Sequence, residues 1–256
     1  MPICLPSFAG VVQPAGGFSN QYSVDFDGSD DYMAAGNISE LNSISAFTIS
    51  MWINFEHITG SSVMSVFTSG SSTSDRIEIV FNSLSQVRFG VNGSISSCSF
   101  SISSPTDYRS TDAWHNIVCT YDGTNVTLFF DGSQKATTTS SVPSSTSSTH
   151  GNDATVGRRT LGGGSFYFNG YIDEVAIWNA TLDSNDIADI YSGGPTDLTK
   201  AASYNTDRTS NLINYWRMGD NDGGTGTTIT DKGSGENHGT LKNIASPFGI
   251  VTDVPS

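Results

Sequence analysis

Cationic residues are scarce in this chain. Eleven Lys and Arg stand against 25 Asp and Glu in 256 residues, which gives a formal net charge of −14 at pH 7. Nucleic acid and anionic membrane surfaces would both repel such a protein, so neither is expected as a partner. The negative charge is compatible with a binding site for neutral sugars or divalent cations. It is equally compatible with a surface whose charge only keeps the protein soluble.

Cysteines are few, and long apolar runs are missing. The three cysteines, Cys4, Cys98 and Cys119, contain no Cys-x-x-Cys spacing and cannot form a disulfide framework. Cys119 lies in an alternating segment, so we expect it in the core. No stretch approaches the roughly 18 consecutive apolar residues of a membrane span. The first six residues lack a basic region and contain two prolines, so no secretory signal is expected.

Short strands separated by turn residues dominate the chain. In residues 47–55 every odd position is apolar, which is the period of a strand with one buried face, and Trp52 falls on the other face. Similar segments are expected at 22–27, 46–55, 62–68, 76–81, 86–91 and 94–100. Many short strands of this kind predict a β-sandwich.

Residues 114–132 predict a hairpin. Two alternating runs flank Asp122-Gly123, and Asp131-Gly132 follows the second run. Asp-Gly between alternating apolar runs favours a tight turn because both central residues need a positive φ.

Three segments together resemble a known family. They are 25–33 (DFDGSDDYM), 114–132 (WHNIVCTYDGTNVTLFFDG) and 168–178 (FNGYIDEVAIW). They are similar to laminin-G-like modules of the concanavalin A-like lectin/glucanase superfamily, over about residues 22–192. The resemblance implies an all-β, concanavalin A-like jelly-roll β-sandwich. The resemblance does not imply one function, because lectins, glycosidases and adhesion modules all have this fold.

The predicted organisation has three parts. Residues 1–20 form an extended N-terminal arm, residues 21–194 form the sandwich, and residues 195–256 form a C-terminal extension that packs on it. A short helix is expected near 183–192, because Asp183 can cap it and Gly193 can end it. The arm's apolar side chains are expected to make assembly contacts with a neighbouring subunit. These side chains are Ile3, Leu5, Phe8, Val11 and Val12.

The C-terminal extension carries a second resemblance. Residues 215–231 (YWRMGDNDGGTGTTITD) and 251–255 (VTDVP) look like segments of marine bacteriophage structural proteins. With no secretory signal expected, this resemblance implies a virion surface protein, of capsid-decoration or fibre type, made in the host cytoplasm. Its partners would be other virion subunits in an oligomer, and host cell-surface glycans. The alternatives are a carbohydrate-binding module of a bacterial surface or secreted protein and a non-standard glycan-cleaving enzyme.

An enzyme is the weaker interpretation. Glycosidases of the superfamily carry carboxylates at alternating positions of one strand, so that acid and nucleophile share a cleft. Here Asp173 and Glu174 are adjacent and should point to opposite faces, Glu78 stands alone, and no Gly-x-Ser-x-Gly elbow exists. We therefore expect no catalytic residues.

A structural calcium ion is the one cofactor that the resemblance implies. The predicted ligands are Asp27 and Asp30 beside the first strand and Asp173 in the last core strand, since calcium needs hard oxygen ligands. In the alternative, Asp27, Asp30 and Asp31 cap a tight turn and Asp173 bonds to their backbone amides.

Glycan contacts are expected from aromatic and planar polar side chains in or beside loops. Trp52, Trp114, Trp178 and Trp216 all lie in apolar strand contexts and are assigned to the core. The predicted glycan contacts are Tyr108, Arg109, Phe166 and Tyr167.

Overall fold

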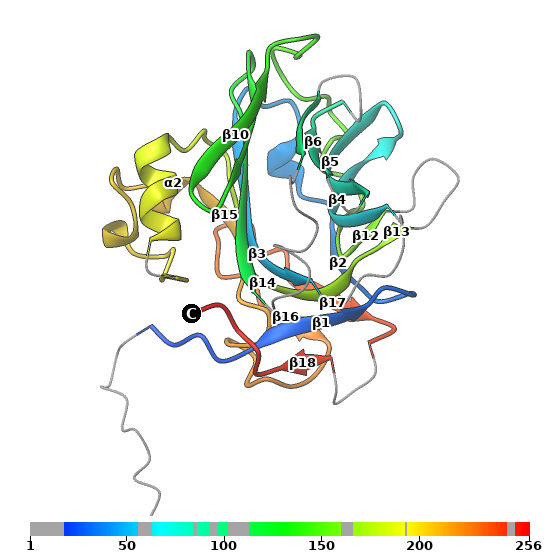
Figure 1. Cartoon of the computed structure of the whole chain (residues 1–256), viewed down its shortest axis with the longest axis vertical. Coiled ribbons are helices and arrows are strands. Elements are labelled where there is room, and N and C mark those ends of the chain that lie inside the picture. Colours follow the sequence, from blue (N-terminus) through cyan, green and yellow to red (C-terminus); the bar gives the residue numbers. More distant parts are fainter. Residues whose placement is uncertain are drawn as a thin grey trace, which may run out of the picture.

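The computed structural model describes residues 18–55, 63–83, 86–92, 97–101, 113–159, 166–192, 194–244 and 249–256. Two large antiparallel sheets face each other (Figure 1). The five apolar residues of the predicted arm lie outside the described residues, as do Tyr108 and Arg109.

The first sheet contains the predicted hairpin and the last core strand. Its order is β10-β9-β8-β3-β14-β1-β18, and β15 pairs with β14 beyond the end of the β1 pairing. The strands are β1 Ser23–Asp27, β3 Phe47–Phe55, β8 Trp114–Tyr121, β9 Val126–Phe130, β10 Ser133–Thr138, β14 Asn169–Trp178, β15 Leu212–Trp216 and β18 Ile250–Val251.

The second sheet has the order β16-β17-β2-β11-β4-β5-β6-β7. Its strands are β2 Tyr32–Gly36, β4 Met64–Ser72, β5 Asp75–Ser83, β6 Gln86–Gly90, β7 Ser97–Ser101, β11 Ala154–Val156, β16 Thr228–Ile229 and β17 Gly239–Lys242. A small separate ribbon joins β12 Arg158–Arg159 to β13 Phe166–Tyr167 and lies beside β4 (Figure 1).

The main core fills the space between the two sheets. Alternation along each strand directs one row of side chains inward, and aromatic pairs join the layers. The rings of Phe55 and Phe81 meet edge to face at 4.6 Å, and those of Phe47 and Phe89 at 6.2 Å. Cys119 is fully buried in this core, as expected.

A second apolar cluster covers the outer face of the first sheet. Helix α2 (Ser184–Tyr191) begins as predicted, because the Asp183 carboxylate accepts hydrogen bonds from the backbone amides of Asn185 and Asp186. Its Tyr191 stacks on Trp52, with 5.8 Å between ring centroids, which explains the outward Trp52. The 3₁₀ turns η1 Ser39–Leu41, η2 Ala201–Ser203 and η3 Thr209–Asn211 complete the helical structure of the described residues.

The residues after 194 add strands to both sheets. Strand β15 pairs with β14 in the first sheet, and β17 pairs with β2 in the second. Tyr215 and Trp216 are fully buried. The C-terminal segment is therefore part of the sandwich's hydrogen-bonded structure (Figure 1).

The predicted all-β jelly-roll sandwich is confirmed. Predicted strand ends differ from the observed ends by a few residues. The pairing of β4 with β5 and of β5 with β6 continues beyond the predicted strand ends, and β-bulges interrupt its register. Among the described residues, no helix combines the length and apolarity that crossing a membrane would require.

Candidate functional site

One row of small and polar residues crosses the outer face of the second sheet. Thr155 of β11 is paired with both Ala34 of β2 and Thr68 of β4, and Thr68 is paired with Glu78 of β5. Directly paired residues lie on the same face of a sheet. The row therefore forms a continuous polar strip on the face opposite the core.

The strip is hollowed over β2, β11 and β4. The hollow has a volume of about 220 Å³. It is lined by Tyr32, Ala34, Gly36, Thr68, Gly70, Asp153, Ala154, Thr155 and Arg158. Gly70 has φ +114°, and a Cβ there would lie 2.0 Å from the Asp75 carbonyl oxygen, so this position requires glycine.

Arg158 and Tyr32 form one side of the hollow. The guanidinium Cζ of Arg158 lies 3.4 Å from the centroid of the Tyr32 ring. The Thr155 hydroxyl donates a hydrogen bond of 2.8 Å to the Arg158 carbonyl oxygen and so fixes the backbone of β12 over β11. Stacking on an aromatic face holds a guanidinium in a defined orientation.

Three more arginines gather next to the hollow, around the buried Glu78. Arg76 Nε and Arg88 Nη2 each lie 2.5 Å from a Glu78 carboxylate oxygen, and Arg159 Nη1 lies 3.2 Å away. Burial lowers the pKa of the Arg159 guanidinium, while the negative charge of Glu78 raises it. Both oxygens of the Glu78 carboxylate are thus engaged, whereas the three arginines carry more N–H donors than Glu78 can accept.

Two of the predicted glycan contacts lie beside this cluster. Phe166 and Tyr167 form β13 and are half-buried, and β13 pairs with β12. The Phe166 ring lies 4.2 Å from Arg159 Cζ. The structure therefore brings Phe166 and Tyr167 next to the arginines.

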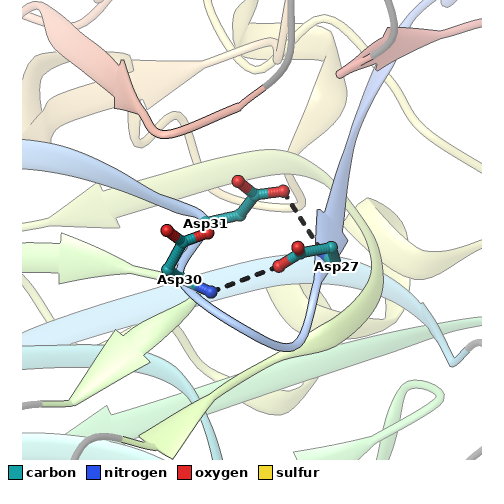
Figure 2. A group of neighbouring side chains, drawn as sticks. All are labelled: Asp27, Asp30 and Asp31. Carbon is teal, nitrogen blue, oxygen red and sulfur yellow. Dashed lines mark hydrogen bonds between the residues drawn. The ribbon is translucent and has the colours of Figure 1, made fainter.

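The predicted calcium ligands are only partly brought together. Figure 2 shows Asp27, Asp30 and Asp31 around the β1–β2 turn, and their carboxylate oxygens lie within 4.8 Å of one another. The Asp27 carboxylate accepts hydrogen bonds from the amides of Ser29 and Asp30, as a turn-capping residue does. Burial, with the nearby negative charges, raises the pKa of Asp31. These three carboxylates fit a calcium ion by donor type and spacing.

Asp173 lies apart from that group. It is fully buried in β14, opposite Trp52 of β3, and its carboxylate accepts hydrogen bonds from the Asn20 side chain and the Glu174 amide. The predicted alternative, hydrogen bonds from the backbone amides of the first-strand turn, is wrong for Asp173, because the amide that donates to it is that of Glu174.

Glu174 occupies a bulge of β14 with φ +50° and points away from the core. The expectation that Asp173 and Glu174 point to opposite faces is therefore wrong, because the bulge places both on the outer side of the first sheet. Its carboxylate accepts a hydrogen bond from the Tyr215 hydroxyl and pairs with Arg217 Nε at 3.0 Å. Burial raises the pKa of Glu174 to about 7, and burial together with Glu174 raises that of Asp173 well above its usual range. Both carboxylates are less than one-tenth exposed.

Sequence reasoning missed most of the hollow. Its residues come from β2, β4, β11 and β12, and only the strand register reveals that they are neighbours. One local signal was present: Arg158-Arg159 is the only pair of adjacent cations in this acidic chain, and Phe166-Tyr167 follows shortly after it.

Residues 27–188, more than half of the chain, match a laminin-G family model described as "Concanavalin A-like lectin/glucanases superfamily". No protein in a search of curated sequences matches the chain.

Similar folds occur among solved structures. A "putative carbohydrate binding protein from Bacteroides ovatus" has a TM-score of 0.61 at 15% identity, over 93% of this chain and 62% of that chain. A carbohydrate-binding module of the Ruminococcus gnavus IT-sialidase, bound to α2,3-sialyllactose, has a TM-score of 0.52 at 13% identity, over 68% of this chain and 100% of that chain. At these identities the similarity concerns the fold.

Proposed function

Because the chain belongs to the concanavalin A-like lectin/glucanase superfamily, we propose that it is a non-enzymatic module that binds carbohydrate in the hollow on its second sheet. The observation that carries this proposal is the hollow itself. It combines an aromatic ring, a stacked arginine and two threonines on a rigid sheet face. Ligand sites commonly combine an apolar surface with a few fixed polar groups in this way.

The size of the hollow limits what can enter it. Its 220 Å³ lies below the clefts of about 300–1,000 Å³ that hold drug-sized ligands. We therefore expect it to accept roughly one sugar residue, such as the end of a glycan chain. The similar structures named for carbohydrate and sialyllactose binding are consistent with this proposal.

The carboxylates support a binding role rather than hydrolysis. Glycosidases need two carboxyl groups that flank the scissile bond, one acting as the acid and the other as the base or nucleophile. In the described part of the chain, the carboxylate nearest the hollow on β5 is Glu78, and both its oxygens are held by arginines. Asp153 also lines the hollow but is exposed.

The biological setting that we propose is the surface of a virion, in contact with other virion subunits. The support is the resemblance of residues 215–231 and 251–255 to marine bacteriophage structural proteins, together with the apolar residues of the N-terminal arm. Deleting residues 1–17 should impair incorporation into particles while glycan binding persists. A deletion variant that is incorporated normally would contradict the proposed role of the arm.

The binding proposal is tested by filling the hollow. Ala34 lines it from β2, so Ala34→Leu should occupy the space and abolish binding to any glycan identified on an array. Ala180→Leu, at a half-buried position that neither lines the hollow nor packs against the main core, is the control. Both variants should be checked for an unchanged circular dichroism spectrum. Undiminished binding by Ala34→Leu, or no glycan bound by the wild type, would contradict the proposal.

A further inference from the structure

Building on the proposed carbohydrate-binding role, we propose that the ligand is an acidic glycan, whose sugar carboxylate is bound by the arginines at the hollow. The cluster consists of Arg76, Arg88, Arg158 and Arg159 and is called the arginine cluster below.

The first argument is the distribution of charge. The arginine cluster contains four of the eleven Lys and Arg residues in a chain of net charge −14. Among the described residues that line the hollow or form an ion pair with these arginines, the carboxylates are Glu78, which is buried among them, and Asp153 at the edge of the hollow. A local surplus of positive charge on an acidic protein favours an anion at this place.

The second argument is the surplus of hydrogen-bond donors. A guanidinium carries five N–H donors, and Glu78 offers only two oxygens to three arginines. The buried Nε atoms of Arg88, Arg158 and Arg159 have no hydrogen-bond partner. Those Nε atoms are themselves out of reach of a ligand, but they show that Glu78 leaves the cluster short of acceptors. The partly exposed guanidinium groups of Arg88 and Arg159 can offer their remaining N–H donors to an incoming carboxylate.

The third argument is that the hollow and the arginine cluster adjoin. Strand β4 lies between them: Thr68 and Gly70 line the hollow, and their partners on β5 are Glu78 and Arg76. Arg158 belongs to both, since it lines the hollow and directly precedes Arg159. A sugar ring in the hollow would therefore lie next to guanidinium groups.

The fourth argument is preorganisation. Arg158 is held over Tyr32, Arg159 over Phe166, and Arg88 on Glu78, so little side-chain entropy remains to be lost on binding. The side chains of Arg88 and Arg159 keep 18% and 12% of their surface exposed. Planar guanidinium groups fixed in this way match a planar carboxylate, which accepts two parallel hydrogen bonds.

The test compares ligands that differ only in the carboxylate. Trigalacturonic acid and its methyl ester form one pair, and sialyllactose and its methyl ester form another. An array that also carries sulfated and neutral glycans identifies the preferred class, and calorimetric titration then measures the affinity for each member of the pairs. The wild type should bind the carboxylate-bearing member of at least one pair, and binding should weaken as salt is added.

The variants test whether binding needs the arginine side chains themselves or only positive charge in general. Arg158→Gln should weaken binding by about tenfold or more, because it removes a charge-assisted hydrogen bond to the sugar carboxylate. Arg158→Lys should restore binding only in part, since it keeps the charge without the planar fork. The control Lys135→Gln removes an exposed cation from β10 of the other sheet and should leave affinity unchanged. Arg76 is avoided because its loss would leave Glu78 less well paired.

The outcomes distinguish this inference from the binding proposal. If neutral glycans bind, and Ala34→Leu abolishes their binding while Arg158→Gln does not, the module binds carbohydrate but the acidic-ligand inference is wrong. Preference for sulfated glycans alone would also overturn it. If no glycan of any class binds, both proposals fail.

Discussion

Arg158 Cζ lies 3.4 Å from the centroid of the Tyr32 ring, and this contact ties β12 to β2 across the width of β11. The pair forms a wall of the hollow from residues 126 positions apart in the sequence. Tyr32 follows directly after the acidic turn at Asp27, Asp30 and Asp31. The connection from β1 to β2 therefore positions both the aromatic wall of the hollow and the group of carboxylates.

The Glu78 carboxylate should be important for stability. It is fully buried among Arg76, Arg88 and Arg159. Breaking a buried ion pair by removing one partner costs about 3–5 kcal/mol, so Glu78→Gln should lower the free energy of unfolding by that order. Urea unfolding measures the change, with Glu236→Gln at an exposed position as control. Equal stability of the two variants would mean that the arginines do not need Glu78.

Trp216 should anchor the C-terminal segment. It is fully buried in β15, and its indole N–H donates to the Asn237 carbonyl oxygen at 2.8 Å. Trp216→Ala should cost about 3–5 kcal/mol, because it leaves a large cavity. Trp114, which the sequence pattern assigned to the core, is only half-buried, so Trp114→Ala should cost less. If Trp216→Ala costs no more than Trp114→Ala, the segment does not contribute to the stability of the sandwich as described.

Stability should fall as pH rises from about 5 to 8 because of Asp173 and Glu174. Burial raises the pKa of both carboxyl groups, to about 7 for Glu174. A group with a raised pKa in the folded state contributes stability that is fully present below its unfolded pKa, near 4, and is lost as pH rises through the folded pKa. Asp173→Asn should therefore flatten the dependence of Tm on pH, whereas exposed Asp189→Asn should not. The same slope in all three proteins would contradict this assignment.

The calcium site stays a prediction, with Asp31 taking the place that sequence analysis gave to Asp173. If Asp27, Asp30 and Asp31 hold calcium, adding Ca²⁺ to the EDTA-treated protein should raise Tm by mass action. Asp30→Asn should remove that response, and Asp189→Asn should keep it. If Ca²⁺ does not raise the Tm of the wild type, the calcium prediction is wrong and the three carboxylates only cap the turn.

Local patterns predicted local structure well. The hairpin at 114–132 forms as predicted, but its loop spans residues 122–125, where the Asp122 carboxylate accepts hydrogen bonds from the amides of Thr124 and Asn125. The tight turn with two positive φ angles occurs at Asp131-Gly132 instead. The start of α2 follows from Asp183, whose effect extends over only a few residues. Phe166 and Tyr167 could be named as candidates because aromatic residues near a loop are visible in sequence.

Long-range arrangement could not be predicted from the same patterns. The hollow depends on which strands pair and in what register, and no local pattern records that Thr155 lies between Ala34 and Thr68. Asp173 was grouped with Asp27 through a family resemblance. In the structure the β1–β14 register places Asn169 opposite Asp27 instead, so Asp173 lies four residues further along its strand.

The most direct test of the account is to locate the bound glycan. Backbone amide signals can be followed by NMR while the preferred acidic glycan is titrated into the ¹⁵N-labelled protein. The account predicts that the largest shifts occur at Ala34, Thr68, Thr155 and Arg158, around the hollow. Shifts confined to the first sheet or to the acidic turn at Asp27, Asp30 and Asp31 would contradict it.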